Sequence, residues 1–273
     1  MNPAAMEPLP RTSPDEQVWR YLPLTRLLTA IETRRLSLTR LSQYLKDDPY
    51  ETSVVKAVDD ADVRITDTTS EMQSLGSEPT STSDGGVGPS DQERQRRLQA
   101  RRRAILRSAH ASCRRSGDES EAMWRLYCSD GYGVAIRSTF QKLKDFINDP
   151  LTVVSSVAYI DYRTEAFVRY QFDYDPALHK RKAFEHEQEV RVLRFSKDDF
   201  DIAAVDPLHA SPEHVDVEWN PEAVVDRVVL SPRCPDWFLD AVTREIQKWS
   251  MTIGEKVQPS DLAAIPYGVS MLR

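Results

Sequence analysis

The chain has 273 residues and a formal net charge of −7, with 40% hydrophobic and 29% charged residues. This composition is typical of a globular protein with ample length for a core, and it excludes a chain that is disordered throughout. No apolar run approaches the roughly 20 residues of a membrane span, and the acidic balance excludes a protein that is basic overall. The three cysteines, Cys113, Cys128 and Cys234, lack metal-ligand spacing, so we expect a reduced, cytoplasmic compartment.

Two segments have the composition of linkers. Residues 1–15 are rich in proline, which predicts a flexible leader without the pattern of a secretion signal. Residues 66–92 are dominated by Ser, Thr, Gly and Pro, which predicts a disordered insertion. The elements before this insertion are too small to bury a core alone, so we expect a single domain over residues 16–273.

Hydrophobic periodicity predicts strands and helices along the rest of the chain. Without strict βαβ alternation, their order predicts an α+β fold with a single mixed or antiparallel sheet and flanking helices. In chain order, we expect strands over 18–22, 36–38, 112–116, 133–137, 152–160, 187–195, 215–219 and 224–230, and helices over 24–34, 50–58, 91–109, 119–127, 140–146, 177–184 and 235–249, with a helix followed by a loop over 161–175.

The helix predicted over 91–109 is crowded with arginines between Arg94 and Arg107. A solvated helix face is the first interpretation of such a charge run. The alternative is a surface that contacts the phosphates of a nucleic acid. No aromatic side chain is interleaved to stack on bases, which favours the first interpretation.

The stretch from Lys182 to Arg191 concentrates charge beside an alternating apolar segment. On a strand, Glu187, Glu189 and Arg191 project from one face, while the residues between them project from the other. We interpret this row of charged side chains as the functional face, because a purely apolar core would exclude charged residues. The alternative is a ladder of salt bridges with Arg20 or Lys182.

A second acidic group surrounds the proline of Asp47-Asp48-Pro49-Tyr50-Glu51. An Asx-type turn that caps the following helix is the first interpretation. The alternative is that these acids border a site. Hard oxygen ligands for the Mg²⁺ of a nuclease would then be Asp47, Asp48, Glu51, Glu187 and Glu189.

Five separated motifs resemble, in this order, a widespread bacterial family, the domain of unknown function numbered 2971. The resemblance covers the chain from Trp19 to about Ile246 and implies no established activity. The motifs are Trp19–Tyr21, Asp48–Glu51, Glu119–Tyr127, Gly131–Ile136 and Lys182–Arg191.

A second resemblance is to the ADP-ribosyltransferases of the arginine type. It rests on Arg20, then Tyr127 or Ser129, then Glu187-Gln188-Glu189. The resemblance implies cleavage of the nicotinamide glycosidic bond of NAD, which builds positive charge on the ribose. It also implies that Glu189 stabilises this charge and that Glu187 orients or deprotonates the acceptor. Arg20 is expected to hold the phosphates or ribose, and Tyr127 to flank the nicotinamide.

Three functions therefore remain open. The first is an NAD-dependent ADP-ribosyltransferase-like enzyme, such as a toxin or defence effector, whose acceptor the sequence does not identify. The second is a metal-dependent nuclease, and the third is a binding module without enzymatic activity. The candidate site includes, besides the residues of the second resemblance, Tyr21, Asp48, Glu51, Trp124, Lys182 and Arg191.

Overall fold

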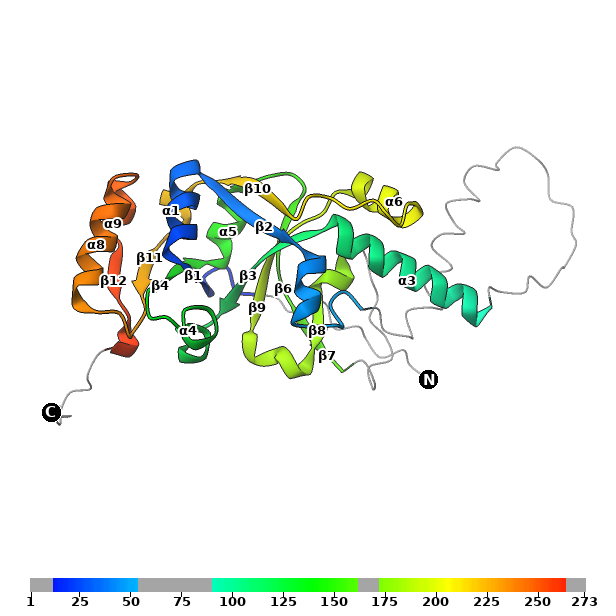
Figure 1. The fold of residues 1–273 in the computed structure, drawn as a ribbon, viewed down its shortest axis with the longest axis horizontal. Helices are drawn as coiled ribbons and strands as arrows, with labels where there is room; N and C mark the ends of the chain where they lie inside the picture. Colours follow the sequence, from blue (N-terminus) through cyan, green and yellow to red (C-terminus); the bar gives the residue numbers. More distant parts are fainter. Residues whose placement is uncertain (1–11, 54–89, 162–171, 264–273) are drawn as a thin grey trace, which may run out of the picture.

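The computed structural model describes residues 12–53, 90–161 and 172–263, and Figure 1 shows their arrangement. The strands of its main sheet are β1 (Gln17–Pro23), β2 (Arg35–Arg40), β3 (His110–Ser116), β4 (Gly133–Thr139), β5 (Ile147–Asn148), β6 (Thr152–Ser156), β9 (Glu189–Arg194), β10 (His214–Trp219), β11 (Arg227–Leu230) and β12 (Val257–Pro259). A second, two-stranded sheet pairs β7 (Ala158–Ile160) with β8 (His179–Arg181).

The main sheet has ten strands in the order β12-β11-β4-β1-β3-β2-β10-β5, and β9 joins β3 to β6. Strands β11 and β12 pair in parallel, and the other pairings of this sheet are antiparallel. The α+β class with a mixed sheet and flanking helices is therefore confirmed.

The helices cover the two faces of this sheet. Their bounds are α1 (Leu24–Thr33), α3 (Asp91–Ser108), α4 (Glu121–Tyr127), α5 (Phe140–Phe146), α6 (Lys197–Val205), α7 (Pro221–Val224), α8 (Asp236–Gln247) and α9 (Met251–Gly254), and the 3₁₀ helices are η1 (Leu41–Lys46), η3 (Asp175–Leu178), η4 (Lys182–Glu187) and η5 (Asp261–Ala263). Side-chain oxygens of Ser90 and Ser120 cap α3 and α4, as expected for serine at this position. No helix in the described part of the chain is long and apolar enough to cross a membrane.

Alternation along the strands sends neighbouring side chains to different cores. One face of the sheet packs against α1, α5, α8 and α9, and Val190 and Val192 of β9 belong to this core. The opposite face carries two smaller cores, one around α3 and α6 with Leu193, and one around α4 with Trp19 and Tyr21. The polar residues of β9 lie on this second face, between the two smaller cores.

Strand β3 has an unusual pair of neighbours. Strand β9 pairs with one edge of β3 along its length, from His110 to Arg115. Strands β1 and β2 must therefore share the other edge, where β2 pairs with His110 and Ala111 and β1 with Arg115 and Ser116. The residues between, 112–114, have no strand beside them on that edge. The sheet thus forks here, and α1 connects the two branches.

Several sequence-based boundaries are wrong. The helix expected over 177–184 is instead η3, strand β8 and η4, and the strand expected over 187–195 begins at Glu189. Gln188, with a left-handed φ of 43°, ends η4 and explains this late start. The strand expected over 152–160 divides at Val157, because β6 pairs with β9 whereas β7 pairs with β8.

Other differences are local. Residues 221–224 form α7, so the strand expected over 224–230 begins at Arg227. The helix expected over 50–58 is a turn as far as Ser53, and its remainder lies outside the described residues. The insertion over 66–92 lies almost entirely outside them, as do residues 1–11 of the expected leader. Within that leader, the carbonyl oxygen of Pro14 accepts a hydrogen bond of 3.0 Å from the N–H of Gln141.

Gly133, the first residue of β4, packs directly against the buried Cys128. A methyl group at this position would overlap Sγ and Cβ of Cys128 and lie 3.3 Å from its Cα. We therefore expect Gly133→Ala to lower the free energy of unfolding by about 1–3 kcal/mol, measured by urea denaturation. Removing the opposing side chain in Cys128→Gly should reduce the effect of Gly133→Ala. A double-mutant cycle with no coupling between the two substitutions would contradict this packing.

Candidate functional site

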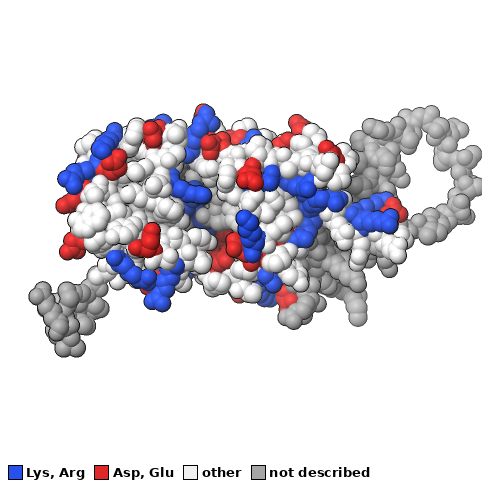
Figure 2. All heavy atoms as spheres, viewed as in Figure 1, with Lys and Arg blue, Asp and Glu red and all other residues white. Residues whose placement is uncertain are grey.

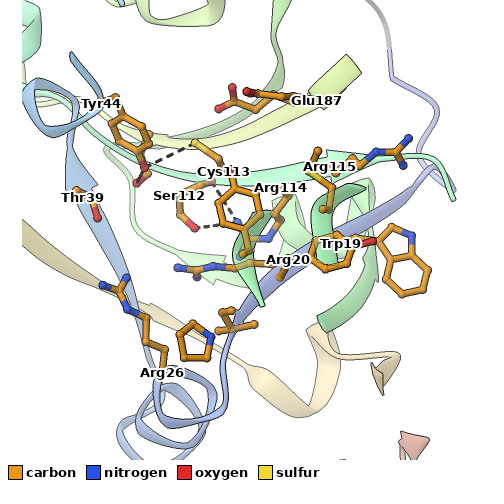
Figure 3. A pocket seen from close by; sticks show the side chains of 17 residues that line it. Trp19, Arg20, Arg26, Thr39, Tyr44, Ser112, Cys113, Arg114, Arg115 and Glu187 are labelled. Carbon is orange, nitrogen blue, oxygen red and sulfur yellow. Dashed lines mark hydrogen bonds between the residues drawn. The ribbon is translucent and has the colours of Figure 1, made fainter. Parts of the chain in front are cut away.

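The fork in the sheet opens into a pocket of about 340 Å³ (Figure 3). Five consecutive residues of β1, 19–23, line one side, and five residues of β3, 111–115, form its floor. Met123 and Tyr127 of α4 and the carboxylates of Glu187 and Glu189 complete the wall on the second face of the sheet. The volume is within the usual range of small-molecule sites.

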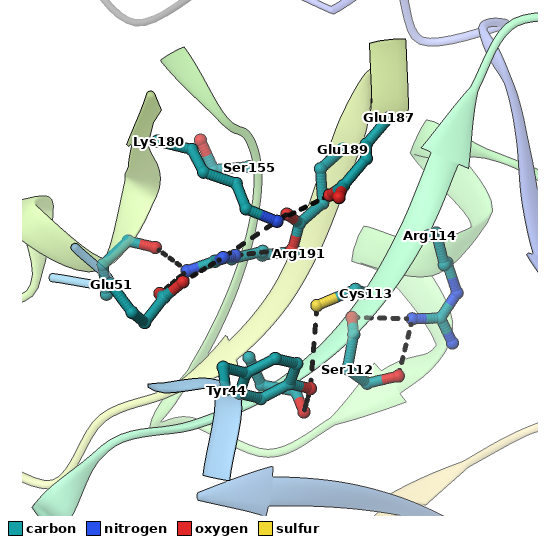
Figure 4. A network of polar contacts seen from close by, with 12 residues as sticks. Tyr44, Glu51, Ser112, Cys113, Arg114, Ser155, Lys180, Glu187, Glu189 and Arg191 are labelled. Atoms are coloured by element: carbon teal, nitrogen blue, oxygen red, sulfur yellow. Dashed lines mark hydrogen bonds and ion pairs between the residues drawn. The ribbon is translucent and has the colours of Figure 1, made fainter. Parts of the chain in front are cut away.

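The carboxylate wall is held by one lysine (Figure 4). Lys180 Nζ of β8 lies 2.6 Å from Glu187 Oε2 and 3.2 Å from Glu189 Oε2. The ring of Phe184 lies 4.7 Å from the same ammonium group. Lys180 therefore brings the carboxylate at the end of η4 to that at the start of β9, and it fixes both at the pocket wall.

Arg191 joins this wall to the turn at residues 48–52. Its side chain is fully buried and binds Glu51 through both terminal nitrogens, at 2.5 and 3.1 Å. Its Nε lies 2.6 Å from Glu189 Oε1, and Nη1 also donates to the carbonyl oxygen of Ala177. Burial by itself lowers the pKa of Arg191, but Glu189 and Glu51 outweigh burial and hold it well above the usual value. This guanidinium is a structural centre and not a pocket group.

Glu189 is permanently ionised at neutral pH. Burial raises the pKa of its carboxyl group, but the charges of Arg191 and Lys180 outweigh burial and lower it to about 2. Both of its oxygens take part in ion pairs. Glu187 differs, because the structure describes a partner only for its Oε2.

The opposite side of the pocket carries arginines. Arg20 of β1, Arg114 of β3 and the exposed Arg26 of α1 line it, and none of them forms an ion pair with a described carboxylate. Arg115 also lines the pocket, but its guanidinium turns away and donates to the carbonyl oxygens of Ser116 and Asp118. The pocket therefore has a basic wall and an acidic wall.

Aromatic rings border the space between these walls. The Trp19 indole donates to the Gly117 carbonyl oxygen at 2.8 Å, and the Tyr21 hydroxyl accepts from Ser120 N–H at 2.8 Å. Tyr127 is 52% exposed and lines the pocket. The Tyr44 hydroxyl donates to the Ala111 carbonyl oxygen at 3.1 Å and thereby fixes a ring at the open side of the fork.

The pocket brings together Arg20, Tyr21, Tyr127, Glu187 and Glu189 from the predicted site. Glu187 reaches it from a 3₁₀ helix and not, as predicted, from the strand itself. The remaining candidates lie elsewhere: Trp124 is buried in the core of α4, Ser129 and Lys182 are exposed away from the lining, and Asp48, Glu51 and Arg191 are buried beneath the acidic wall.

The acidic turn has a structural role. Asp48 Oδ1 accepts the N–H of Tyr50 at 3.0 Å, which is the predicted Asx-type turn, and lies 2.7 Å from Arg181. Arg191 binds both oxygens of Glu51, whereas Arg181 contacts only Oδ1 of Asp48, so both acids belong to ion pairs with arginines. No group of three or more potential metal ligands occurs within the described residues.

Several arginines of α3 bond to the protein itself. Arg101 lies 3.4 Å from Asp173, Arg102 donates to the carbonyl oxygens of Pro49 and Glu51, and Arg107 donates to that of His209. These contacts fasten the C-terminal half of α3 to the domain. On the face shown in Figure 2, basic and acidic side chains are interspersed.

Among the charged groups at the pocket, the lining arginines Arg26, Arg114 and Arg115 were not predicted, and neither was Lys180, which binds the two carboxylates from outside the lining. A signal was present for Arg114, because two arginines in an otherwise buried strand are uncommon. The position of Arg26 depends on how α1 spans the fork. Lys180 was missed because residues 177–184 were predicted to form a helix, whereas Lys180 lies on strand β8.

The low pKa of Glu189 predicts a specific loss of stability in acid. Because its pKa is lower in the folded chain than the roughly 4.3 of an unfolded chain, Glu189 stabilises the fold above that pH. This contribution, about 3 kcal/mol, is lost as the pH falls from about 5 to 2. The free energy of unfolding of Glu189→Gln should therefore fall less steeply over this pH range than that of the wild type. The substitution Glu32→Gln, at an exposed position, should leave the pH dependence of the wild type unchanged. Equal pH slopes for Glu189→Gln and the wild type would contradict the ion-pair assignment.

Comparisons with the curated proteins and with the solved structures find no match to this chain. A family match does occur over the segment from α4 to β9, which contains Tyr127, Lys180 and both pocket carboxylates. Residues 123–192 match the family described as "Protein of unknown function (DUF2971)", and over this segment the resemblance predicted from the sequence is confirmed.

Proposed function

We propose that the pocket binds a nucleotide and that the protein is an NAD-dependent, ADP-ribosyltransferase-like enzyme. The observation that carries this proposal is the convergence of Arg20, Tyr127 and the Glu187–Glu189 pair on one pocket. These residues come from β1, α4 and the η4–β9 junction, which are far apart in the sequence. A basic group, an aromatic ring and a carboxylate are the three functions that such a reaction needs.

The charge distribution supports a ligand with two different ends. Phosphate groups are favoured beside the arginines, because a guanidinium can donate two parallel hydrogen bonds to phosphate oxygens. A ribose that gains positive charge is favoured beside the carboxylates. Tyr127 offers a flat face for a base or for nicotinamide. The basic and acidic walls thus define an orientation for the bound nucleotide.

We assign the contact with the ribose to Glu187. Glu189 was the expected partner of the ribose, but both of its oxygens hold Arg191 or Lys180. Glu187 Oε1 has no described partner, and the side chain is 17% exposed at the pocket. In this proposal, Glu189 holds Lys180, and Lys180 in turn orients Glu187.

The proposed reaction breaks the bond between the ribose C1′ and the nicotinamide nitrogen. Nicotinamide leaves as a neutral molecule with the bonding electron pair, and positive charge develops on the ribose. The carboxylate of Glu187 stabilises this charge electrostatically. An acceptor, which is water in the hydrolytic case, then bonds to C1′ and loses its proton to the solvent, giving an ADP-ribosylated product or free ADP-ribose.

Release of labelled nicotinamide from NAD tests this proposal, with water alone and with nucleic-acid or protein acceptors. We expect Glu187→Gln to lower kcat about 100-fold or more, because the amide keeps the shape but loses the charge. Glu255→Gln removes an exposed carboxylate outside the pocket and should retain the wild-type rate. No release by the wild type with any acceptor, or equal rates for Glu187→Gln and wild type, would refute the proposal.

A further inference from the structure

Arg114 is the most deeply buried basic group of the pocket. Its side chain belongs to the middle of β3, at the part of the strand edge that neither β1 nor β2 covers. The residue is 7% exposed, and its Nη1 makes only long hydrogen bonds, of 3.3 and 3.4 Å, to Oγ and the carbonyl oxygen of Ser112. The structure describes no acceptor for its other donors.

A second guanidinium lies beside it. Arg20 lines the same part of the pocket, and its charge lowers the pKa of Arg114 in addition to burial, which is the main cause, so that this pKa is about 9. Burial also lowers the pKa of Arg20, and the charge of Arg26 contributes in the same direction. The three arginines therefore form a row from the floor of the pocket to its mouth, with Arg20 in the middle (Figure 3).

The neighbouring titratable groups do not compensate these charges. Cys113 and Tyr44 are the groups whose ionised forms would favour the charged arginines. Burial raises the pKa of both the Cys113 thiol and the Tyr44 hydroxyl, so both are neutral at pH 7. The pocket carboxylates, by contrast, are already engaged with Lys180, and Glu189 also with Arg191.

Such an arrangement is costly without a counter-charge. A cation removed from water loses several kcal/mol of solvation free energy, which a paired counter-charge offsets. A like charge nearby adds repulsion to this loss. A protein that pairs Arg191 with two carboxylates has not paired Arg20 and Arg114 in the same way. The two arginines that lack this compensation both line the pocket.

We infer that the row Arg114–Arg20–Arg26 is a subsite for a diphosphate group, with one phosphate between Arg114 and Arg20 and the second between Arg20 and Arg26. Two phosphates match the row better than one, because a single phosphate between the two inner arginines leaves Arg26 without a partner. The Ser112 hydroxyl, beside Arg114, is a further donor to the inner phosphate. This inference deepens the proposed function and rests on it for the nucleotide that carries the diphosphate.

Titration calorimetry of the full chain with inorganic pyrophosphate tests the subsite directly. We expect the wild type to bind pyrophosphate more tightly than inorganic phosphate, and ADP more tightly than adenosine. Arg114→Gln and Arg20→Gln should each weaken pyrophosphate binding about 10- to 100-fold, because each removes a charge-assisted hydrogen bond. Arg125→Gln removes the same charge from the exposed face of α4 and should bind as the wild type does.

The two arginine variants make the test robust to a folding defect. Thermal unfolding is recorded for each, and Arg20→Gln carries the test when Arg114→Gln does not fold, because Arg20 is less buried. Absence of pyrophosphate binding by the wild type would overturn the inference. Equal affinities of wild type and a folded arginine variant would also overturn it, since binding would then be electrostatic attraction to the general surface.

The outcome is separable from that of the nicotinamide assay. Pyrophosphate and ADP binding without nicotinamide release supports the subsite and refutes NAD as substrate. If pyrophosphate binds and ADP does not bind more tightly than pyrophosphate, the result supports a subsite for free inorganic diphosphate. Nicotinamide release that is unaffected by Arg20→Gln and Arg114→Gln supports the enzyme and overturns the subsite.

Discussion

The buried guanidinium of Arg191 is the interaction on which the geometry of the pocket depends. A charge with no exposed surface requires a partner for every donor, and these partners come from three separate segments. Glu51 belongs to the turn after η1, Ala177 to η3 and Glu189 to β9 itself. Because Glu189 is fixed in this way, it can hold Lys180, and Lys180 holds Glu187 at the pocket wall. A structural ion pair thus determines where an accessible carboxylate lies.

The fork in the sheet provides the second requirement, which is space. An unbroken sheet would place a strand beside the middle of β3 and would fill the edge at which the pocket opens. Because β1 and β2 each pair with only one end of β3, the side chains between them line a pocket instead. The fork also allows side chains from both faces of the sheet to reach one space, since Arg20 and Trp19 are neighbours on a strand yet both line it.

Local patterns in the sequence predicted the elements, and non-local pairing decided the site. Alternation placed Glu189 and Arg191 on one face of β9, because side-chain direction on a strand depends only on position along it. The segment before it was mistaken for a helix, since 3₁₀ turns share the composition of α-helices and the left-handed Gln188 has no sequence signature as clear as glycine. The partners of Arg191 and the exposure of Arg114 depend on which strands share an edge. No spacing along the chain contains that information.

The two walls of the pocket differ in electrostatic compensation. On the acidic wall each carboxylate has a cation within 3.2 Å, so this wall is stable by itself. On the basic wall Arg20 and Arg114 have each other and neutral neighbours, an arrangement that destabilises the fold. Residues that lower stability in this way are concentrated at functional sites, because a ligand of opposite charge converts the unfavourable term into binding energy. The basic wall is therefore stronger evidence for a ligand than the acidic residues that first drew attention to this part of the chain.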